Sequence, residues 1–322
     1  MNILFITHTR IGDAVLSSGL LRHLVERYPT ARFTIACGPL AAPLFAFVPR
    51  LERVIVVTKR RFDAHWYRLW KELRGTVWDI VVDLRRSLIF YVIPVRRRHI
   101  IGPITGGEHQ VTHLSRLLDL PQPAAPFLYV DARHQLAASV LIPEGAPVLA
   151  LAPVAATSAK TWPAERFAEL AVRLTGGAEA PCAGWRIAVF GGRDDAERAA
   201  PLVEALSRAG LGYIGVFGEP DLLTVTAALA RCRAFVGNDS GLAHLAAVAG
   251  LPTLALFGAT DPNRYGPFGG RVVRAPPDPQ AADPQAVGPQ AAGPQAGYNL
   301  GHLAVDPVIA AFCALFPSKP AF

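Results

Sequence analysis

The sequence predicts an α/β protein made of two Rossmann-like domains whose parallel sheets face each other across a cleft. Short apolar runs rich in β-branched residues alternate with helical patterns, which is typical of βαβ units. This alternation occurs twice along the 322 residues, a length that suits roughly two domains of about 150 residues each. Residues 141–147, with two prolines and a glycine, separate the two series and indicate the boundary. We therefore expect domains over residues 1–143 and 147–322.

In the first half, the loop after the first strand carries the most informative polar residues. Strands are expected over residues 2–7, 32–36, 53–57, 79–84 and 98–101, and a helix with one apolar face over residues 14–28. Gly12 and Asp13 lie between the first strand and this helix. Ligands of open α/β sheets bind at the carboxyl ends of the strands, so Asp13 is a candidate functional carboxylate. The alternative is an N-cap that satisfies free backbone N–H groups.

In the second half, the strand pattern restarts and is interrupted once. Strands are expected over residues 148–152, 186–190, 213–216, 234–236 and 253–257, with helices beginning near Pro163, Asp195, Leu222 and Gly241. Residues 276–297 repeat a Pro-Gln-Ala unit, which predicts a flexible surface insertion, with a binding role as the alternative. A last helix is expected over residues 306–316, with Asp306 as its N-cap.

Two loops of the second half suit a phosphate-bearing ligand. Ser240 and Gly241 open a helix after a strand, where backbone N–H groups and the helix dipole attract a diphosphate. Lys160 precedes another helix start and can neutralise a phosphate as a point charge. The alternatives are an N-cap serine, a core histidine at His244 and a solvated lysine. No GxGxxG fingerprint follows either first strand and no Walker A motif occurs, so dinucleotide oxidoreductases and P-loop kinases lose their main support.

The charge of the chain bears on its partners. A formal charge of +7 and a pI near 9.5 suit nucleic acid, a phosphorylated small molecule or an anionic membrane surface. Nucleic acid fits less well, because no stacking platform or recognition motif accompanies the charge. Arg85 and Arg86 lie in the basic part of the first half and suit an acidic acceptor, with surface solubility as the alternative. We expect no nucleic-acid partner.

The expected location of the protein in the cell follows from the apolar segments of its sequence. The start of the chain has a four-residue apolar run and then reaches an arginine, so it lacks the apolar region of a secretory signal. The most apolar later stretch, residues 242–259, is interrupted by His244, Gly250 and Pro252 and is shorter than the roughly 20 residues that span a bilayer. We expect a cytoplasmic protein, peripheral at the inner membrane if its acceptor is a lipid.

Together these segments resemble glycosyltransferase family 9, the ADP-heptose:lipopolysaccharide heptosyltransferases. The resemblance rests on Gly12-Asp13, residues 160–163, residues 237–244 and residues 257–262, in that order, and on residues 81–102. It implies the GT-B fold, with the acceptor in the N-terminal domain and the nucleotide sugar in the C-terminal one. It also implies an inverting glycosyltransferase that transfers a heptose or related sugar from an ADP-sugar to a lipopolysaccharide core or similar glycan.

The resemblance also implies roles for single residues. Asp13 matches the general base, Lys160 the lysine on the donor diphosphate, and Asp239 the carboxylate near the donor sugar. The phosphate loop of the family corresponds to Ser240, Gly241 and His244. Binding of the donor ribose is assigned to Asp195, and binding of the adenine to the backbone of residues 219–222. Arg85 and Arg86 are assigned to the anionic glycolipid acceptor at the membrane surface.

The chain departs from the family pattern in places. Ala155 and Ala156 stand where some members carry hydroxyl side chains, so Thr157 or Ser158 is expected to substitute. The four cysteines show no metal-binding spacing, and no DxD motif occurs, so we expect neither a metal nor a cofactor besides the ADP-sugar donor. Two alternatives stay open: a nucleotide-sugar epimerase or hydrolase of the same fold, and a non-catalytic sugar-nucleotide-binding protein.

Overall fold

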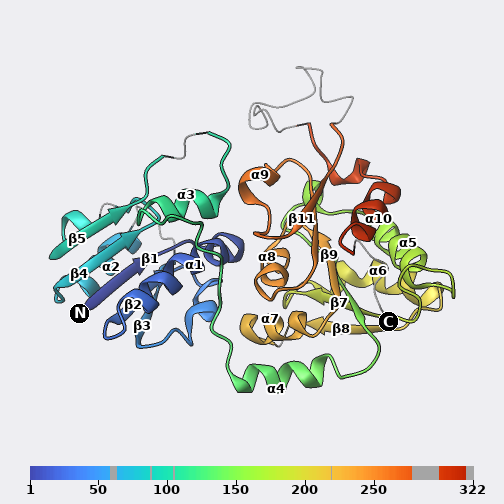
Figure 1. The fold of residues 1–322 in the computed structure, drawn as a ribbon, viewed down its shortest axis with the longest axis horizontal. Helices are drawn as coiled ribbons and strands as arrows, with labels where there is room; N and C mark the ends of the chain where they lie inside the picture. The colour runs from blue at the N-terminus through green and yellow to red at the C-terminus, as the bar shows by residue number, and fades with distance from the viewer. Residues whose placement is uncertain (59–63, 88, 104–105, 219, 278–296, 317–322) are drawn as a thin grey trace. The chain divides into compact units, whose positions relative to one another are not determined.

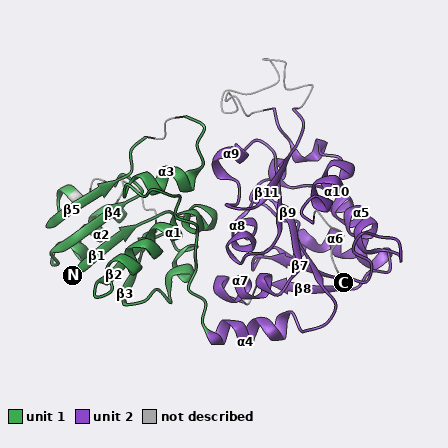
Figure 2. Ribbon diagram, in the orientation of Figure 1, with its two compact units in different colours: residues 1–131 green, residues 132–322 purple. Residues whose placement is uncertain are grey.

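The computed structural model describes the chain except for residues 59–63, 88, 104–105, 219, 278–296 and 317–322. The described chain forms two compact units, Met1–Asp131 and Ala132–Phe322 (Figure 2). This division precedes the helix α4 (Ala132–Leu141), whereas the boundary expected from residues 141–147 follows it. Helix α4 belongs to the second unit because it packs on the helix α7 (Leu222–Ala230), where His134 Nε2 lies 3.7 Å from Asp221 Oδ1.

The first unit is a five-stranded parallel sheet in the order β3-β2-β1-β4-β5 (Figure 1). Its strands are β1 (Asn2–Ile6), β2 (Arg32–Cys37), β3 (Leu51–Val56), β4 (Trp78–Asp83) and β5 (Val95–Ile100). Its helices are α1 (Ile11–Arg27), α2 (Ala64–Leu73) and α3 (Gln110–Arg116), with short 3-10 turns at Ala42–Phe45 and Ile89–Tyr91.

Alternation of side chains along β1 assigns the helices of this unit to the two faces of the sheet. Leu4 and Ile6 pack in one buried cluster with Leu69 of α2. Thr7 points to the other face, where its Oγ1 lies 2.7 Å from Ser17 Oγ of α1. Helices therefore cover both faces, as expected for a doubly wound parallel sheet.

The second unit is a six-stranded parallel sheet in the order β11-β10-β9-β6-β7-β8. Its strands are β6 (Val148–Ala152), β7 (Arg186–Gly191), β8 (Tyr213–Phe217), β9 (Ala234–Asn238), β10 (Thr253–Phe257) and β11 (Arg271–Arg274). Besides α4 and α7, its helices are α5 (Ala164–Thr175), α6 (Ala196–Arg208), α8 (Gly241–Val248), α9 (Pro262–Tyr265) and α10 (Val305–Cys313), with 3-10 turns η4 (Ser158–Lys160) and η5 (Leu300–His302).

One core cluster of the second unit lies between its sheet and three helices. Fully buried side chains from β6, α5, α6 and α10 form one cluster that includes Leu149, Phe167, Leu202 and Phe312. Full burial of an apolar side chain of this size stabilises the fold by about 1.5–3 kcal/mol. The two expected Rossmann-like parallel sheets are thus confirmed.

Two local expectations were wrong, and one strand was missed. Strand β11 was not predicted, because its four residues begin and end with arginine and form no apolar run. Helix α1 begins at Ile11, so it already includes Gly12 and Asp13. Asp306 is the second residue of α10 rather than its N-cap. Its Oδ1 forms an ion pair with Arg173 Nη2 at 2.7 Å.

Most of the Pro-Gln-Ala insertion lies outside the described residues. Its two ends are described, and Pro277 and Tyr298 form an antiparallel bridge. The two ends of the insertion therefore lie next to each other. Among the described residues, no helix has both the length and the apolar character needed to cross a bilayer.

Candidate active site

In the first unit, polar side chains gather at the carboxyl ends of β1 and β4. His8 follows β1, Asp13 lies in the first turn of α1, and Asp83 ends β4. The charges of Asp13, Asp83 and Arg85 all act on the His8 imidazole. The structure therefore brings the expected base, Asp13, and the expected acceptor-binding Arg85 to the same imidazole.

Asp13 is the third residue of α1, and this position excludes the capping alternative. The N-cap is Arg10, which has an extended backbone and makes no side-chain capping hydrogen bond. Asp13 is half-buried, and its carboxylate has no hydrogen bond or ion pair within the described chain. Its oxygens are therefore available to a ligand.

The turn after β4 is built by Asp83, a fully buried carboxylate. Its Oδ1 accepts the Arg85 backbone N–H at 2.8 Å, and its Oδ2 accepts the Ser87 N–H at 2.8 Å and the Ser87 hydroxyl at 2.7 Å. These bonds hold Arg86 in the left-handed region, with φ of 53°. Such backbone conformations persist where the surroundings enforce them and cluster at ligand sites.

The two arginines of this turn differ in surroundings. The Arg85 guanidinium lies over the Trp66 ring, 5.1 Å from its centroid, whereas Arg86 is exposed. A ring beneath a guanidinium restricts its plane while leaving its N–H groups free to bind an anion. Asp83 was missed by the sequence analysis, although a carboxylate at a strand end with a serine four residues later is a recognisable signal.

His8 was also missed. Its Nε2 is buried and has no hydrogen-bond partner among the described residues. Burial lowers the pKa of His8; Asp13 and Asp83 act against that lowering, while Arg85 adds to it. The imidazole is therefore neutral at pH 7.

In the second unit, buried hydrogen bonds fix the loop that carries Lys160. Asn238, the last residue of β9, accepts the Trp162 N–H at 3.1 Å and donates Nδ2 to the Pro153 carbonyl at 2.6 Å. The Trp162 indole is fully buried and donates Nε1 to the Leu303 carbonyl at 2.7 Å. The loop after β6 is thereby tied to the end of β9 and to the segment before α10.

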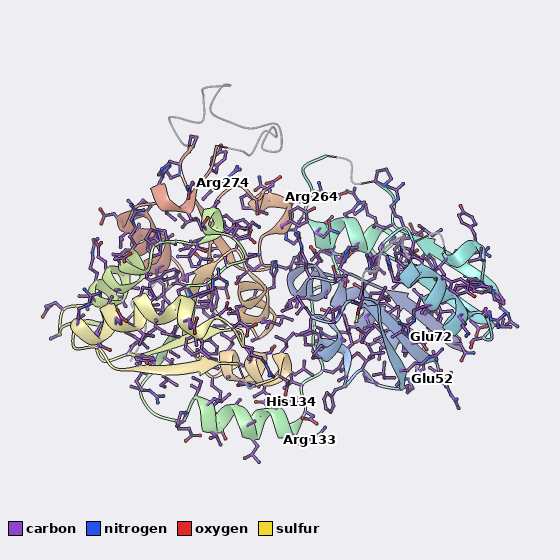
Figure 3. All side chains as sticks on the ribbon, turned by 180° about the vertical axis from the view of Figure 1, so that it is seen from behind. Glu52, Glu72, Arg133, His134, Arg264 and Arg274 are labelled. Atoms are coloured by element: carbon purple, nitrogen blue, oxygen red, sulfur yellow. The ribbon has the colours of Figure 1, made fainter. Side chains whose placement is uncertain are left out.

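The loop after β10 closes the same edge of the sheet. A Cβ at Gly258 would lie 3.1 Å from the Tyr298 carbonyl and 3.2 Å from the Ala159 carbonyl, so a larger residue there would push these segments apart. Arg274, labelled in Figure 3, lies 3.7 Å over the centroid of the Tyr298 ring and donates Nε to the Gly258 carbonyl at 3.4 Å. These contacts hold the residue next to Lys160 in place.

The side chains of Lys160 and Asp239 form an ion pair at the carboxyl edge of the second sheet. Lys160 Nζ lies 2.7 Å from Asp239 Oδ2, and the Thr260 hydroxyl donates to the same oxygen at 2.6 Å. The side chains of Lys160 and Asp239 are 30% and 10% exposed. Thr260 comes from the loop after β10 and was not singled out as a site residue. An anionic ligand at this place would meet a lysine that is already oriented by two neighbouring loops.

The N-terminus of α8 lies directly after Asp239. Ser240 is its N-cap, with an extended backbone, and makes no side-chain capping hydrogen bond. The Ser240 Oγ is buried without a partner in the described part of the chain. The first N–H groups of a helix lack intrahelical partners, so Gly241 begins an uncapped helix end that attracts an anion. His244 is buried on the same helix, 6% exposed.

Three other expected donor-binding residues are placed at the same edge of the sheet. Asp195 accepts the Gly192 N–H at 2.8 Å and pairs with Arg198 Nη1 at 3.2 Å. Arg198 Nη2 also donates to the Ala155 carbonyl, which links the loops after β7 and β6. Thr157 and Ser158 are exposed at η4. Their expected role in donor binding stays a prediction.

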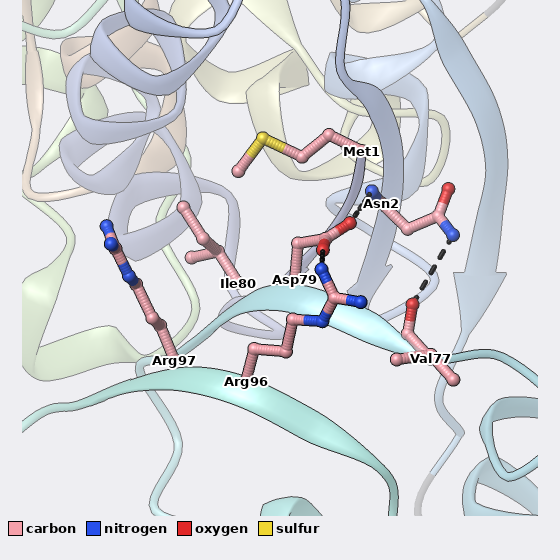
Figure 4. A pocket seen from close by; sticks show the side chains of 7 residues that line it. All are labelled: Met1, Asn2, Val77, Asp79, Ile80, Arg96 and Arg97. Carbon is pink, nitrogen blue, oxygen red and sulfur yellow. Dashed lines mark hydrogen bonds and ion pairs between the residues drawn. The ribbon is translucent and has the colours of Figure 1, made fainter.

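A surface pocket of about 690 Å³ lies elsewhere on the first unit (Figure 4). It is lined by residues at the amino ends of β1, β4 and β5, the edge opposite to Asp13. Asp79 in this pocket is engaged by the Asn2 N–H at 2.8 Å and by Arg96 Nη1 at 3.0 Å. We therefore do not assign the pocket to the active site. Within the described ranges, no group of three or more His, Cys, Asp or Glu side chains could hold a metal ion.

Known proteins resemble the chain in sequence and in fold. The profile of glycosyltransferase family 9 (heptosyltransferase) matches residues 97–281. Lipopolysaccharide heptosyltransferase 1 of Pseudomonas aeruginosa is 28% identical over 305 residues, covering 84% of this chain and 82% of that protein. Lipooligosaccharide heptosyltransferase 2 of Haemophilus ducreyi is 27% identical over 314 residues, covering 85% and 88%. The structure of E. coli ADP-heptose lps heptosyltransferase II matches with a TM-score of 0.73 at 24% identity, covering 98% of both chains.

Two units, each with a parallel α/β sheet, match the GT-B fold of this E. coli structure. The family profile covers more than half of the 322 residues, and the chain belongs to glycosyltransferase family 9. The resemblance expected from its motifs is thus confirmed. The epimerase, hydrolase and non-catalytic alternatives are not favoured.

Proposed function

We propose that this protein is an inverting heptosyltransferase that transfers a heptose from ADP-heptose to a hydroxyl of a lipopolysaccharide core. The P. aeruginosa and H. ducreyi relatives are named as heptosyltransferases of lipopolysaccharide and lipooligosaccharide, and the E. coli protein of similar fold is named for ADP-heptose. The observation that carries the proposal is the uncapped N-terminus of α8 beside the Lys160–Asp239 pair. A diphosphate suits this arrangement of donors and charge.

On the donor side, the sugar–phosphate bond breaks and its electron pair leaves with ADP. Negative charge then grows on the diphosphate, where Lys160 Nζ and the N–H groups of Gly241 stabilise it. Donors that are fixed in advance stabilise a developing charge without reorganisation. Ser240 Oγ gains a partner in this state. Asp239 holds Lys160 in position and faces the donor sugar. These groups supply the positive charge for a metal-independent reaction.

On the acceptor side, Asp13 accepts the proton of the attacking hydroxyl while the new bond to the anomeric carbon forms. Attack on the face opposite to the leaving group inverts the configuration. Arg85 and Arg86 bind anionic groups of the core glycolipid, because a guanidinium makes paired hydrogen bonds to carboxylate or phosphate. The donor site is completed by Asp195, Thr157, Ser158 and His244. His244 contributes to it from the helix α8.

The direct test is transfer by the purified protein. The protein is incubated with ADP-heptose and a lipopolysaccharide core that lacks heptose, and ADP release and the mass of the glycan are followed. We expect one heptose added for each ADP released, with the inverted anomeric configuration. Hydrolysis of the donor without glycan product, or isomerisation of its sugar, would contradict the proposal.

We further propose that the protein acts at an anionic membrane surface, where its acceptor lies. Helix α2 carries exposed Arg68 and Lys71 beside Tyr67, which is 65% exposed. The Trp70 Nε1 donates to the Val92 carbonyl at 3.0 Å, and Val92 is 60% exposed. Basic side chains next to exposed aromatic and aliphatic ones suit the headgroup region of anionic phospholipids. We call these five residues the α2 face.

Vesicle sedimentation tests this surface. Each basic side chain near an anionic bilayer contributes about 1 kcal/mol, so the variant Arg68→Glu/Lys71→Glu should bind phosphatidylglycerol vesicles at least about tenfold more weakly. The matched control, Arg208→Glu/Arg271→Glu, reverses two exposed arginines of the second unit and should bind like the wild type. Equal binding to phosphatidylcholine and phosphatidylglycerol vesicles, or equal losses in both variants, would exclude the α2 face as a docking surface.

A further inference from the structure

His8 occupies a position that packing fixes tightly. Its carbonyl accepts the Gly38 N–H at 3.3 Å. The next residue, Thr9, lies so close to Gly38 that a Cβ on Gly38 would come within 2.6 Å of the Thr9 Cα. The loop after β1 therefore has little room to shift, and the backbone of His8 is held at the carboxyl edge of the sheet.

The imidazole itself is not satisfied by the protein. Its Nε2 is buried and lacks a hydrogen-bond partner within the described ranges. A buried polar atom without a partner costs free energy of folding, and native proteins keep few of them. A leucine at position 8 would avoid this cost. The unpaired nitrogen is explained if a ligand supplies its partner.

The surroundings of His8 restrict what that ligand is. Asp83 is engaged by the turn after β4, with three hydrogen bonds to its two oxygens. Arg85 lies over Trp66. Of the two carboxylates near His8, Asp13 has no hydrogen bond or ion pair in the described chain. A hydroxyl group, which both donates and accepts, suits a place between a neutral imidazole and a free carboxylate.

We infer that His8 is an acceptor-positioning residue, whose Nε2 forms a hydrogen bond with a hydroxyl of the acceptor sugar and aims the attacking hydroxyl at Asp13. The inference rests on the proposed sugar transfer and names a binding contact that Asp13, Arg85 and Arg86 leave open. His8 takes no proton from the reacting oxygen, which remains the role of Asp13. Small errors in the orientation of reacting groups lower rates strongly.

This role predicts opposite effects of one substitution on stability and activity. His8→Leu removes the unpaired nitrogen, so the melting temperature should stay equal or rise. The kcat/KM for the acceptor should fall by about 10- to 100-fold, since one hydrogen bond and the orientation it provides are lost. The Kd for ADP should not change, because nucleotide binding is assigned to the second unit.

Two amide variants locate the nitrogen that matters. A glutamine amide reaches about as far as Nε2, and an asparagine amide about as far as Nδ1. We expect His8→Gln to recover much of the acceptor kcat/KM and His8→Asn to recover little. The matched control is His23→Leu, a half-buried histidine of α1, which should leave transfer unchanged.

The measurements are the melting temperature, ADP titration and steady-state transfer with varied acceptor, on all four variants and the wild type. Transfer by His8→Leu at the wild-type rate would overturn the inference. A lower melting temperature in His8→Leu with no recovery in His8→Gln would also overturn it, because the residue would then be structural. If the wild type transfers no sugar, the proposed function itself fails, which is distinguishable from failure of His8 alone.

Discussion

Replacing Lys160 with alanine tests the donor site through two separate quantities. The Lys160–Asp239 pair is half-buried, with Nζ and Oδ2 2.7 Å apart and exposures of 30% and 10%. Surface pairs contribute about 0–1 kcal/mol, and breaking a buried pair costs about 3–5 kcal/mol. We therefore expect Lys160→Ala to lower the free energy of unfolding by about 1–2 kcal/mol. The Thr260 hydroxyl still donates a hydrogen bond to Asp239 Oδ2 in this variant, which limits the loss of stability.

The catalytic effect of the same change should be greater. Removing one fixed donor from a developing negative charge lowers the rate by about 10²- to 10³-fold, or about 2.7–4 kcal/mol. Lys160→Arg should recover part of the rate, because a planar guanidinium does not replace a point charge at the same distance. Single-turnover transfer and urea unfolding on the same preparations separate the two quantities.

Asp239→Asn provides the matched control for Lys160. It removes the negative charge beside the diphosphate but keeps a side chain of the same size for Thr260. ADP should therefore bind Asp239→Asn at least as tightly as the wild type, and Lys160→Ala about 10-fold or more weakly. The double variant Lys160→Ala/Asp239→Asn completes the comparison. If its change in ADP affinity equals the sum of the two single changes, the coupling expected for residues in contact is refuted. Wild-type kinetics in Lys160→Ala would remove this residue from the site.

Two further predictions concern the donor nucleotide and the insertion. ADP-heptose at about 100 times its Kd should stabilise the protein by roughly 2.7 kcal/mol, and differential scanning fluorimetry that shows equal stabilisation by UDP- and GDP-sugars would contradict an adenine-specific site. Replacing residues 278–296 by two glycines should leave the melting temperature and transfer nearly unchanged, because Pro277 and Tyr298 already pair and loop length contributes little to closure; aggregation or lost transfer would show that the insertion has a binding role.

The sequence predicted the strands well where they are buried. Residues 148–152 and 253–257 match β6 and β10 at both ends, because a strand covered on both faces is a continuous apolar run. It failed at β11, an edge strand with an arginine at each end. The domain boundary also differed, because the contact between α4 and α7 joins segments far apart in the chain and leaves no local pattern.

Two acidic residues near helix starts were placed incorrectly relative to those starts. Asp13 and Asp306 both precede or begin an apolar periodic segment, and both suit an N-cap by sequence. The structure places each inside the first turn, after caps at Arg10 and Ala304. Residue type alone does not separate the N-cap from the next positions, since a carboxylate is favourable at all of them.

The side-chain contacts within the site could not be predicted from the sequence. Lys160 and Asp239 were each expected in the donor site, but their direct contact joins residues separated by 79 positions. His8 became a candidate only when its neighbours and its unpaired Nε2 were visible. Such contacts depend on sheet order, which places the ends of β6 and β9 side by side.

Asp13→Asn tests most directly whether this protein transfers sugar with Asp13 as the base. Asparagine keeps the size and one oxygen of aspartate but cannot accept the proton, so single-turnover transfer of heptose should fall by about 10²- to 10⁴-fold. The melting temperature should change little, because the carboxylate makes no capping bond, and the Kd for ADP should stay the same. Transfer by Asp13→Asn at the wild-type rate would contradict the assignment of the general base and with it the central claim.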